Sequence, residues 1–256
     1  MPDIDAVRLH VSAQNLLLLN VSLGVIMFGV ALNLTIEDFR RLARQPQPAL
    51  VGVGSQFLLL PALTFALVWL LQPRPSIALG MILVAACPGG NISNFMSLNA
   101  DGNTALSVTL TAVATVGAIV LTPLNLSFCG GLYPPAASLL TSVDVSFWRV
   151  FKTVTLILGV PLVLGMTVRR LAPERAQRLS HWMQGLSILL FVGIVLAALR
   201  ANSDHLVGYI GVVFDLVLIH NAVALGAGYQ LAYWAGLSTE NQQTLALETG
   251  IQNSGL

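Results

Sequence analysis

One carboxylate of this sequence lies deep inside an apolar stretch. Glu248 is embedded in Leu245-Ala-Leu-Glu-Thr-Gly and follows the polar residues 238–243. A bare carboxylate in an apolar environment is costly, so it must be protonated, paired or bound to a cation. Because no Lys or Arg lies at a similar depth in a neighbouring apolar segment, a metal cation or a proton is the natural partner. The alternative is a solvated Glu248 near the edge of the segment.

A second set of polar groups interrupts another apolar stretch, in the run Pro88-Gly-Gly-Asn-Ile-Ser-Asn94. Proline removes a backbone donor, and two glycines weaken the helix further. We therefore expect a discontinuous helix near 87–94. Its free carbonyls and amide side chains suit a hard cation such as sodium, and free amides at a half-helix N-terminus suit an anionic substrate. The alternative is a simple proline kink whose polar side chains bond neighbouring helices.

Further polar side chains could complete a cation site. A hydroxyl stripe follows the interruption at spacings that put its members on one helical face: Thr104, Ser107, Thr111 and Thr115. Such hydroxyls also commonly bond the helix backbone or take part in packing. Gln56, midway along an earlier apolar segment, allows both readings. Gln252 follows Glu248 by four residues and shares its face if the helix is continuous there.

Other chemistries find little support in the residues. Cys87 reads as a small buried residue rather than a metal thiolate, and two cysteines in or beside apolar runs argue against a disulfide framework. The pair His220-Asn221 suggests interhelical hydrogen bonding. The sequence contains no zinc pattern, phosphate loop or Ser/His/Asp set, so an intramembrane enzyme is the least supported class.

The elements that position these residues are membrane helices. The chain is 55% hydrophobic and only 9% charged, with a mean hydropathy of +0.80. Soluble domains carry about 25% charged residues, so the solvent of this chain is a lipid bilayer. A net charge of +1 gives no indication of nucleic-acid binding. The acidic N-terminus, with Asp3 and Asp5, does not resemble a cleaved signal peptide.

A spanning helix needs about 20 apolar residues. That criterion gives eight segments, at 14–34, 47–71, 76–98, 103–127, 147–169, 181–200, 206–236 and 242–256. Two arginine clusters, within 40–44 and 169–178, then fall on the same side. The excess of positive charge places that side in the cytoplasm of an inner-membrane protein and the N-terminus outside. The runs 89–94 and 249–254 are weakly similar and suggest inverted repeats, 1–132 and 133–256.

Four motifs follow one another along the chain: Met27-Phe-Gly-Val-Ala-Leu, Cys87-Pro-Gly-Gly-Asn-Ile-Ser-Asn94, Ala105-Leu-Ser-Val-Thr-Leu-Thr111 and Glu248-Thr-Gly-Ile-Gln-Asn-Ser254. In this order they resemble the bile acid:sodium symporter family. The resemblance covers nearly the whole chain. It implies an all-α polytopic membrane protein with a panel domain, a core domain and two discontinuous crossing helices.

The resemblance also implies a sodium-coupled symporter of a small organic anion, such as a bile acid or small carboxylate, working by alternating access with two sodium ions. One ion site would use Ser93, Asn94, Ser107, Thr111 and Glu248. The other would use Gln56, Glu248, Gln252 and the backbone carbonyls of Thr249 and Ile251. Asn91 and Asn253 would face the substrate cavity.

Compared with the family pattern, the first repeat lacks the first helix, and the sequence stops at Leu256 inside the second discontinuous helix. We therefore expect a C-terminally truncated member. Two alternatives stay open. The related arsenite-efflux carriers share the fold and rely on a membrane cysteine, which would make Cys87 essential. A non-transporting fragment is the other reading.

Overall fold

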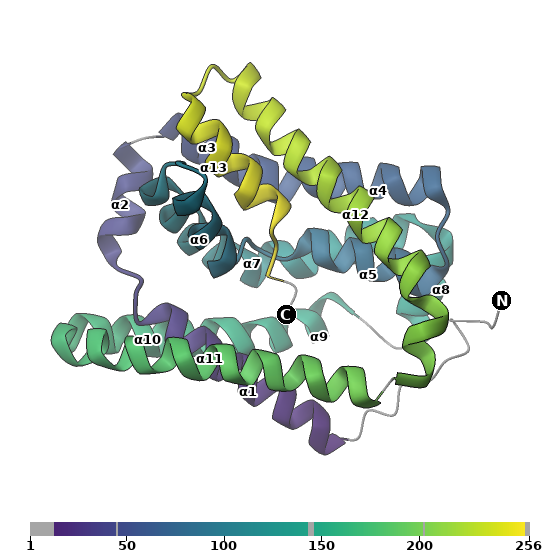
Figure 1. Cartoon of the computed structure of the whole chain (residues 1–256), viewed down its shortest axis with the longest axis horizontal. Coiled ribbons are helices and arrows are strands. Elements are labelled where there is room, and N and C mark those ends of the chain that lie inside the picture. The colour runs from purple at the N-terminus through teal and green to yellow at the C-terminus, as the bar shows by residue number, and fades with distance from the viewer. Residues whose placement is uncertain (1–12, 45, 143–145, 202, 254–256) are drawn as a thin grey trace. The chain divides into compact units, whose positions relative to one another are not determined.

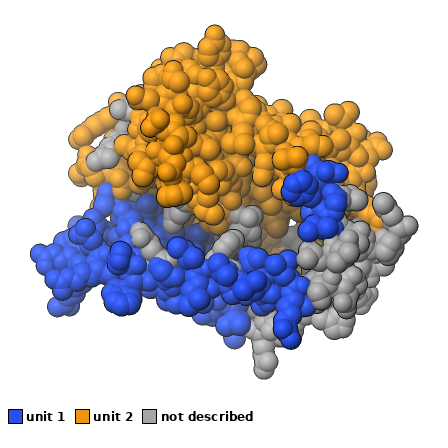
Figure 2. All heavy atoms as spheres, viewed as in Figure 1, with its two compact units in different colours: residues 1–35, 153–215, 255–256 blue, residues 36–152, 216–254 orange. Residues whose placement is uncertain are grey.

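The computed structural model describes residues 13–44, 46–142, 146–201 and 203–253, and nearly all of them are helical (Figure 1). The chain divides into two compact units (Figure 2). Unit 1 comprises residues 1–35, 153–215 and 255–256, and unit 2 comprises residues 36–152 and 216–254. Each unit combines segments that are far apart in the sequence.

Five helical segments are long and apolar enough to cross a membrane: Pro46–Leu71, Thr104–Leu132, Phe147–Leu171, Pro173–Ala197 and Val213–Trp234. Two shorter apolar helices, Leu17–Ala31 and Pro75–Ala86, accompany them. These positions follow the predicted segments, and the chain is an all-α, multi-pass membrane protein. Proline at the first helical position sets several starts, among them Pro75 and Pro173, because its missing N–H has no partner there anyway.

Unit 1 is built from α1 (Ala13–Ala31), the π-helix η3 (Thr155–Gly159), α10 (Val160–Leu171), α11 (Pro173–Ala201) and the start of α12 (Ser203–Trp234). Helix α1 packs against α10 and α11. The approach to α10 is close, since a Cβ on Gly165 would lie 2.5 Å from Ala31 Cβ. Helix α11 begins at Pro173, so most of the gap predicted between the segments 147–169 and 181–200 is helical, including Arg175 and Arg178.

Unit 2 contains the first polar interruption. Its elements are α2 (Ile36–Arg44), α3 (Pro46–Gly54), the π-helix η2 (Ser55–Leu59), α4 (Leu60–Leu71), α5 (Pro75–Ala86), α6 (Asn91–Asn99), α7 (Thr104–Leu132), α8 (Pro134–Ser142), most of α9 (Phe147–Val154), the second part of α12 and α13 (Thr239–Gly250). A buried cluster joins α4, α5, α7 and α8 and includes Val68, Met81 and Leu126. Thr64 Oγ1 and His220 Nε2 form a buried 2.7 Å hydrogen bond between α4 and α12. His220 therefore bonds between helices as expected, whereas its neighbour Asn221 is exposed.

Two of the predicted segments are not single helices. The 76–98 segment breaks between Ala86 and Asn91, giving α5 and α6. Pro88 and the two glycines after it supply no continuing helical hydrogen bonds, which agrees with the expected discontinuity. In the predicted 242–256 segment, α13 ends at Gly250, and the described residues 251–253 after it are not helical.

Candidate cation site at the break between α5 and α6 and the end of α13

The α5–α6 break and the end of α13 lie against each other. Gly89 and Gln252 form an isolated antiparallel bridge, and Asn253 N–H donates to Pro88 O at 2.8 Å. Two short extended segments from distant parts of the chain thus pair inside a helical unit. Each leaves a helix end facing the pairing, and helix ends carry free carbonyls or amides. This pairing, called the crossing below, therefore brings the backbone carbonyls and amides of several helix ends together at one place.

Glu248 projects into this crossing from the last turn of α13 and is completely buried. Ser93 Oγ and Ser107 Oγ donate to Glu248 Oε1 at 2.6 and 2.5 Å. Thr111 Oγ1 and Gln56 Nε2 lie 3.1 and 3.2 Å from Glu248 Oε2. The solvated alternative for Glu248 is wrong, because the side chain has no exposed surface. Every polar contact that the structure gives to the carboxylate comes from a neutral group.

Only part of the predicted hydroxyl stripe on α7 contacts the Glu248 carboxylate. Ser107 and Thr111 are buried and also face Asn94 Oδ1, at 2.7 and 3.1 Å. A hydroxyl has one hydrogen to donate, so neither can satisfy Asn94 and Glu248 together. The site therefore holds more oxygen lone pairs than hydrogens. Thr115 instead donates to the α7 backbone, at Thr111 O, which is the ordinary role of a membrane threonine.

Gln56 reaches the site through the π-helix η2. Its side chain is completely buried, and its Oε1 lies 3.5 Å from Gly89 N at the α5–α6 break. In η2, Leu60 N–H bonds to Ser55 O, five residues back. Pro61 cannot donate to Phe57 O, and Asn125 Nδ2 does so instead at 3.0 Å. Asn125 on α7 thus stabilises the π-helix η2, which is called a bulge below.

The end of α13 contributes the other set of oxygens. Gln252 lies beyond Gly250, where α13 ends, so the condition of a continuous helix that a shared face with Glu248 requires is not met. Its side chain folds back, and Nε2 donates to Thr249 O at 2.7 Å and to Glu248 O at 3.2 Å. Its Oε1 is buried with no hydrogen-bond partner among the described residues. Ile251 has an extended backbone, with φ −116° and ψ 92°, so its carbonyl leaves the helical direction.

A glycine is required where the crossing meets the carboxylate. A Cβ on Gly89 would lie 2.7 Å from Glu248 Oε2 and 3.3 Å from Glu248 O. The backbone at the break therefore approaches the acid as closely as a residue without a side chain allows. The same packing keeps bulk solvent out, and low polarity around a charge strengthens its attraction to any cation.

The predicted substrate-facing residues lie at the start of α6. Asn91 is its first residue, and the structure describes its backbone but not its side chain. Asn253 packs beside Gly90, since its Cβ would lie 3.5 Å from a Cβ placed there. No side chain caps α6 at Gly90. Ser93 N–H donates to Gly90 O at 3.0 Å, and the amides of Asn91 and Ile92 precede it at the helix N-terminus, the position that an anion would require.

Sequence reasoning missed two partners of the site. Ser55 Oγ and Thr249 Oγ1 form a buried 2.7 Å hydrogen bond that fixes the last turn of α13 to η2. Asn125 holds the bulge that carries Gln56. Both are polar residues inside apolar helices, and that signal alone could have drawn attention to them.

The donor set fits a monovalent cation. Nine side-chain and backbone groups at the site carry oxygen, and Glu248 alone among them carries a formal charge. Within the described part of the chain, no group of three or more His, Cys, Asp or Glu residues could hold a metal ion. Hard cations take oxygen ligands, and the number of charged ligands tunes affinity. A single buried carboxylate, surplus lone pairs and the unpartnered Gln252 Oε1 all match sodium better than a transition metal.

Comparisons with known proteins agree with this class of site. The profile of the Sodium Bile acid symporter family matches residues 20–209, and the chain belongs to that family. It is 33% identical to the "Uncharacterized sodium-dependent transporter YocS" of Bacillus subtilis, over 93% of this chain and 71% of the relative. The family and these relatives are transporters, not enzymes.

Two further relatives are eukaryotic. The chain is 34% identical to the rice "Probable sodium/metabolite cotransporter BASS2, chloroplastic", over 93% of this chain and 55% of that protein. It is 28% identical to the human "Sodium-dependent organic anion transporter", over 91% of this chain and 60% of that protein. The chain thus spans little more than half the length of these two proteins.

Proposed function

We propose that the protein is a sodium-coupled symporter of a small organic anion, working by alternating access with two sodium ions as co-transported cargo. One observation carries the proposal. Glu248 is completely buried at the crossing and is surrounded by neutral oxygen and amide groups, without a cationic side chain among the described residues. A carboxylate in that setting needs a small mobile cation as its counter-charge.

The first sodium ion would be held between α6, α7 and α13. Its ligands would be Ser93, Asn94, Ser107, Thr111 and Glu248. The hydroxyl oxygens of Ser107 and Thr111 already lie within 3.3 Å of the Asn94 amide oxygen and of a Glu248 carboxylate oxygen. The hydroxyl groups have too few hydrogens to satisfy all these acceptors. A bound sodium ion would take the place of their hydrogen bonds to Glu248 and Asn94, and the hydroxyls would turn their lone pairs toward the ion.

The second ion would lie between η2 and the end of α13. Its ligands would be Gln56, Glu248, Gln252 and the carbonyls of Thr249 and Ile251. The unpartnered Gln252 Oε1 supports this assignment, because a buried acceptor without a hydrogen bond is costly unless a ligand satisfies it. Glu248 would serve both ions, so a single acid would couple the two sites.

The anionic substrate would bind on the α6 side of the crossing. The uncapped first turn of α6 offers amides with partial positive charge, and Asn91 and Asn253 would add side-chain donors. Sodium would stabilise the pairing of residues 88–90 with 252–253 and thereby the substrate-binding geometry. Coupling requires only that sodium binds the substrate-competent arrangement better than the alternative one, and the effect is reciprocal.

The proposal also assigns larger parts of the chain. Unit 2 would be the core domain, because it contains the crossing, and unit 1 would supply panel helices. Residues 1–132 and 133–256 would be inverted repeats in an inner-membrane protein with an extracytoplasmic N-terminus. Against an arsenite-type carrier, Cys87 is buried and its Sγ donates to Leu83 O at 3.2 Å, inside its own helix.

The test is thermal stabilisation of the purified protein by sodium, with potassium as control. At a sodium concentration 100-fold above Kd, binding stabilises the folded state by about 2.7 kcal/mol. We expect saturable stabilisation by sodium alone, and its loss in Glu248→Gln, which keeps the shape but removes the charge.

Glu240→Gln is the matched control, because Glu240 is an exposed acid in the first turn of the same helix. It should retain the sodium response. A Glu248→Gln variant that responds to sodium like the unmodified protein would refute the assignment of Glu248 as the shared ligand.

A further inference from the structure

A dense basic cluster lies at the turn between α10 and α11, in unit 1. Residues 169–178 contain four of the twelve Lys and Arg residues of the chain and a single acid, Glu174. The cluster follows one membrane-spanning segment and opens the next, since the apolar segments are Phe147–Leu171 and Pro173–Ala197. It is therefore placed where a bilayer surface would be.

The arginines of this cluster are available to an external anion. Arg170, Arg175 and Arg178 are exposed, and among the described residues they form no ion pair. The other cluster, on α2, differs. There Arg40 and Arg44 lie 3.6 and 3.3 Å from the two carboxylate oxygens of Glu37. Among the described residues, the α10–α11 cluster thus forms no ion pair, in contrast to the cluster on α2.

One face of α11 changes character in steps along its length. Arg175, Arg178, Trp182, Leu186 and Leu189 follow one another at spacings of three or four residues, so they share a face. Trp182 is 79% exposed and Leu189 is 68% exposed. With a rise of about 1.5 Å per residue, cations, an aromatic ring and aliphatic side chains succeed each other over about 20 Å. A phospholipid presents its headgroup, interfacial region and acyl chain in the same order.

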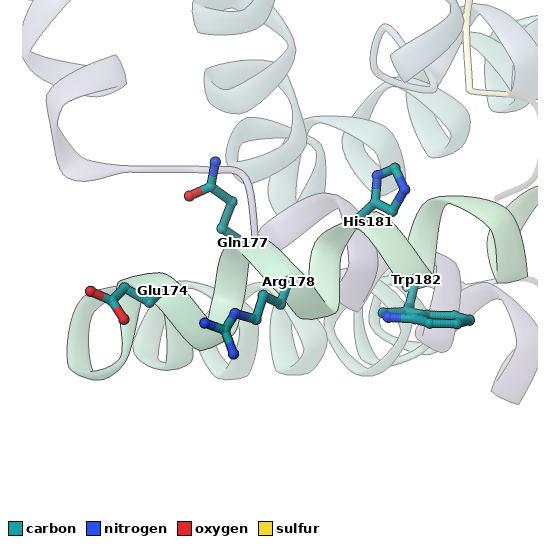
Figure 3. A pocket seen from close by; sticks show the side chains of 5 residues that line it. All are labelled: Glu174, Gln177, Arg178, His181 and Trp182. Carbon is teal, nitrogen blue, oxygen red and sulfur yellow. The ribbon is translucent and has the colours of Figure 1, made fainter.

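A cavity of about 530 Å³ accompanies the basic end of this face (Figure 3). Its lining residues are Glu174, Gln177, Arg178, His181 and Trp182. Figure 3 shows all five projecting from consecutive turns of α11. Arg178, Gln177 and Trp182 all carry N–H donors, which suit phosphate oxygens. None of the proposed sodium ligands lines this cavity.

We infer that this face of α11 binds the headgroup of an anionic phospholipid. Arg175 and Arg178 contact the phosphate, Trp182 lies at the level of the glycerol and ester groups, and Leu186 and Leu189 lie against an acyl chain. Helix α11 suits this role because only 12% of its apolar stretch is buried within the protein, against 50% for α7. The inference does not depend on sodium coupling, since it uses other residues and another unit.

The experiment measures quenching of Trp182 fluorescence by brominated lipids in reconstituted vesicles. The chain has four tryptophans, so the Trp182 signal is the difference between the unmodified protein and Trp182→Phe. We expect about tenfold stronger apparent association of brominated phosphatidylglycerol than of brominated phosphatidylcholine, since each arginine near an anionic surface contributes appreciably. The preference should fall as ionic strength rises.

Two double variants separate a site from general surface charge. Arg175→Gln/Arg178→Gln should abolish the preference for phosphatidylglycerol. Arg40→Gln/Arg44→Gln removes the same charge from the compensated cluster on α2 and should leave it intact. Equal quenching by both lipids, or equal loss in both double variants, would overturn the inference. So would full displacement by millimolar glycerol 3-phosphate, which would indicate a soluble phosphate ligand.

Discussion

The described part of the chain contains two π-helices, η2 and η3, which share a backbone arrangement and differ in the side chains that they place in the protein interior. Each spans five residues and ends two residues before the proline that follows: Ser55–Leu59 precedes Leu60-Pro61, and Thr155–Gly159 precedes Val160-Pro161. In both, the residue before the proline donates its N–H five residues back, to Ser55 O or Thr155 O. The same local rearrangement thus precedes two prolines, whereas Pro123 lies inside α7 without a π-helix.

The second residue of each bulge shows the difference. Gln56 is completely buried and contacts Glu248, whereas Leu156, at the same place in η3, is 67% exposed. The first residue differs as well. Ser55 bonds to Thr249, while Thr155 Oγ1 is buried without a partner in the described part of the chain. A π-helix alone therefore makes no ion site. It changes side-chain direction, and the surrounding unit determines whether a polar group is used.

The largest effect is expected when the second residue of η2, Gln56, is replaced by leucine, the residue at the same position of η3. Gln56→Leu removes an amide that donates to Glu248 Oε2 and, in the proposed function, a sodium ligand. Because hydrogen bonds to charged groups are worth about 1.5–3 kcal/mol, sodium affinity should fall about ten- to hundredfold. The measurement is a sodium titration of the melting temperature against a potassium background.

Leu156→Gln is the matched control for this comparison. It places the same amide at the equivalent position of η3, where the side chain is exposed. Sodium affinity should stay within about twofold of the unmodified value, given that distant sites behave independently. If both variants weaken sodium binding equally, the functional difference between the two bulges is refuted.

The positions of most helices could be predicted from the sequence, because long apolar runs have few possible structures in a bilayer. The break before Asn91 was also predictable from Pro88 and the glycines. The π-helices could not be predicted from the sequence. Ser55 and Thr155 lie in apolar runs, and a helical turn that is wider by one residue leaves the hydrophobicity of such a run unchanged. The early start of α11 was missed because arginines indicate a link by charge, although they form helix well.

The site was predictable to a similar degree. Burial of Glu248 follows from its apolar neighbours, and its chemistry demands a cation or proton. The proposed set of sodium ligands came from the resemblance to a family, since spacing alone left Gln56 and the α7 hydroxyls ambiguous. The return of the Gln252 side chain to Thr249 O could not be foreseen, because it depends on α13 ending at Gly250. Such contacts are set by tertiary pairing with Gly89.

A smaller effect is expected at Asn125, which supports one bulge only. Asn125→Leu would leave Phe57 O, the carbonyl that Pro61 cannot pair, without its donor. A buried unsatisfied carbonyl costs about 1–3 kcal/mol. The variant should melt at a lower temperature with and without sodium, and its sodium affinity should fall less than that of Gln56→Leu. Asn99→Leu serves as control, since Asn99 bonds to its own helix on an exposed surface.

The smallest and most discriminating effect is expected at the first residues of the two bulges. Ser55→Ala removes the hydrogen bond to Thr249 and should lower stability by about 0.6 kcal/mol, the average for such bonds between membrane helices. Thr155→Val removes a buried hydroxyl that has no partner among the described residues, so it should be neutral or slightly stabilising. Both changes delete one hydroxyl from the same position of a π-helix, and opposite signs in reversible unfolding would show that the bulges differ in their partners rather than in their backbone. Equal destabilisation would mean that Thr155 has a partner in the membrane, and the contrast between a used and an unused bulge would then rest on Gln56 alone.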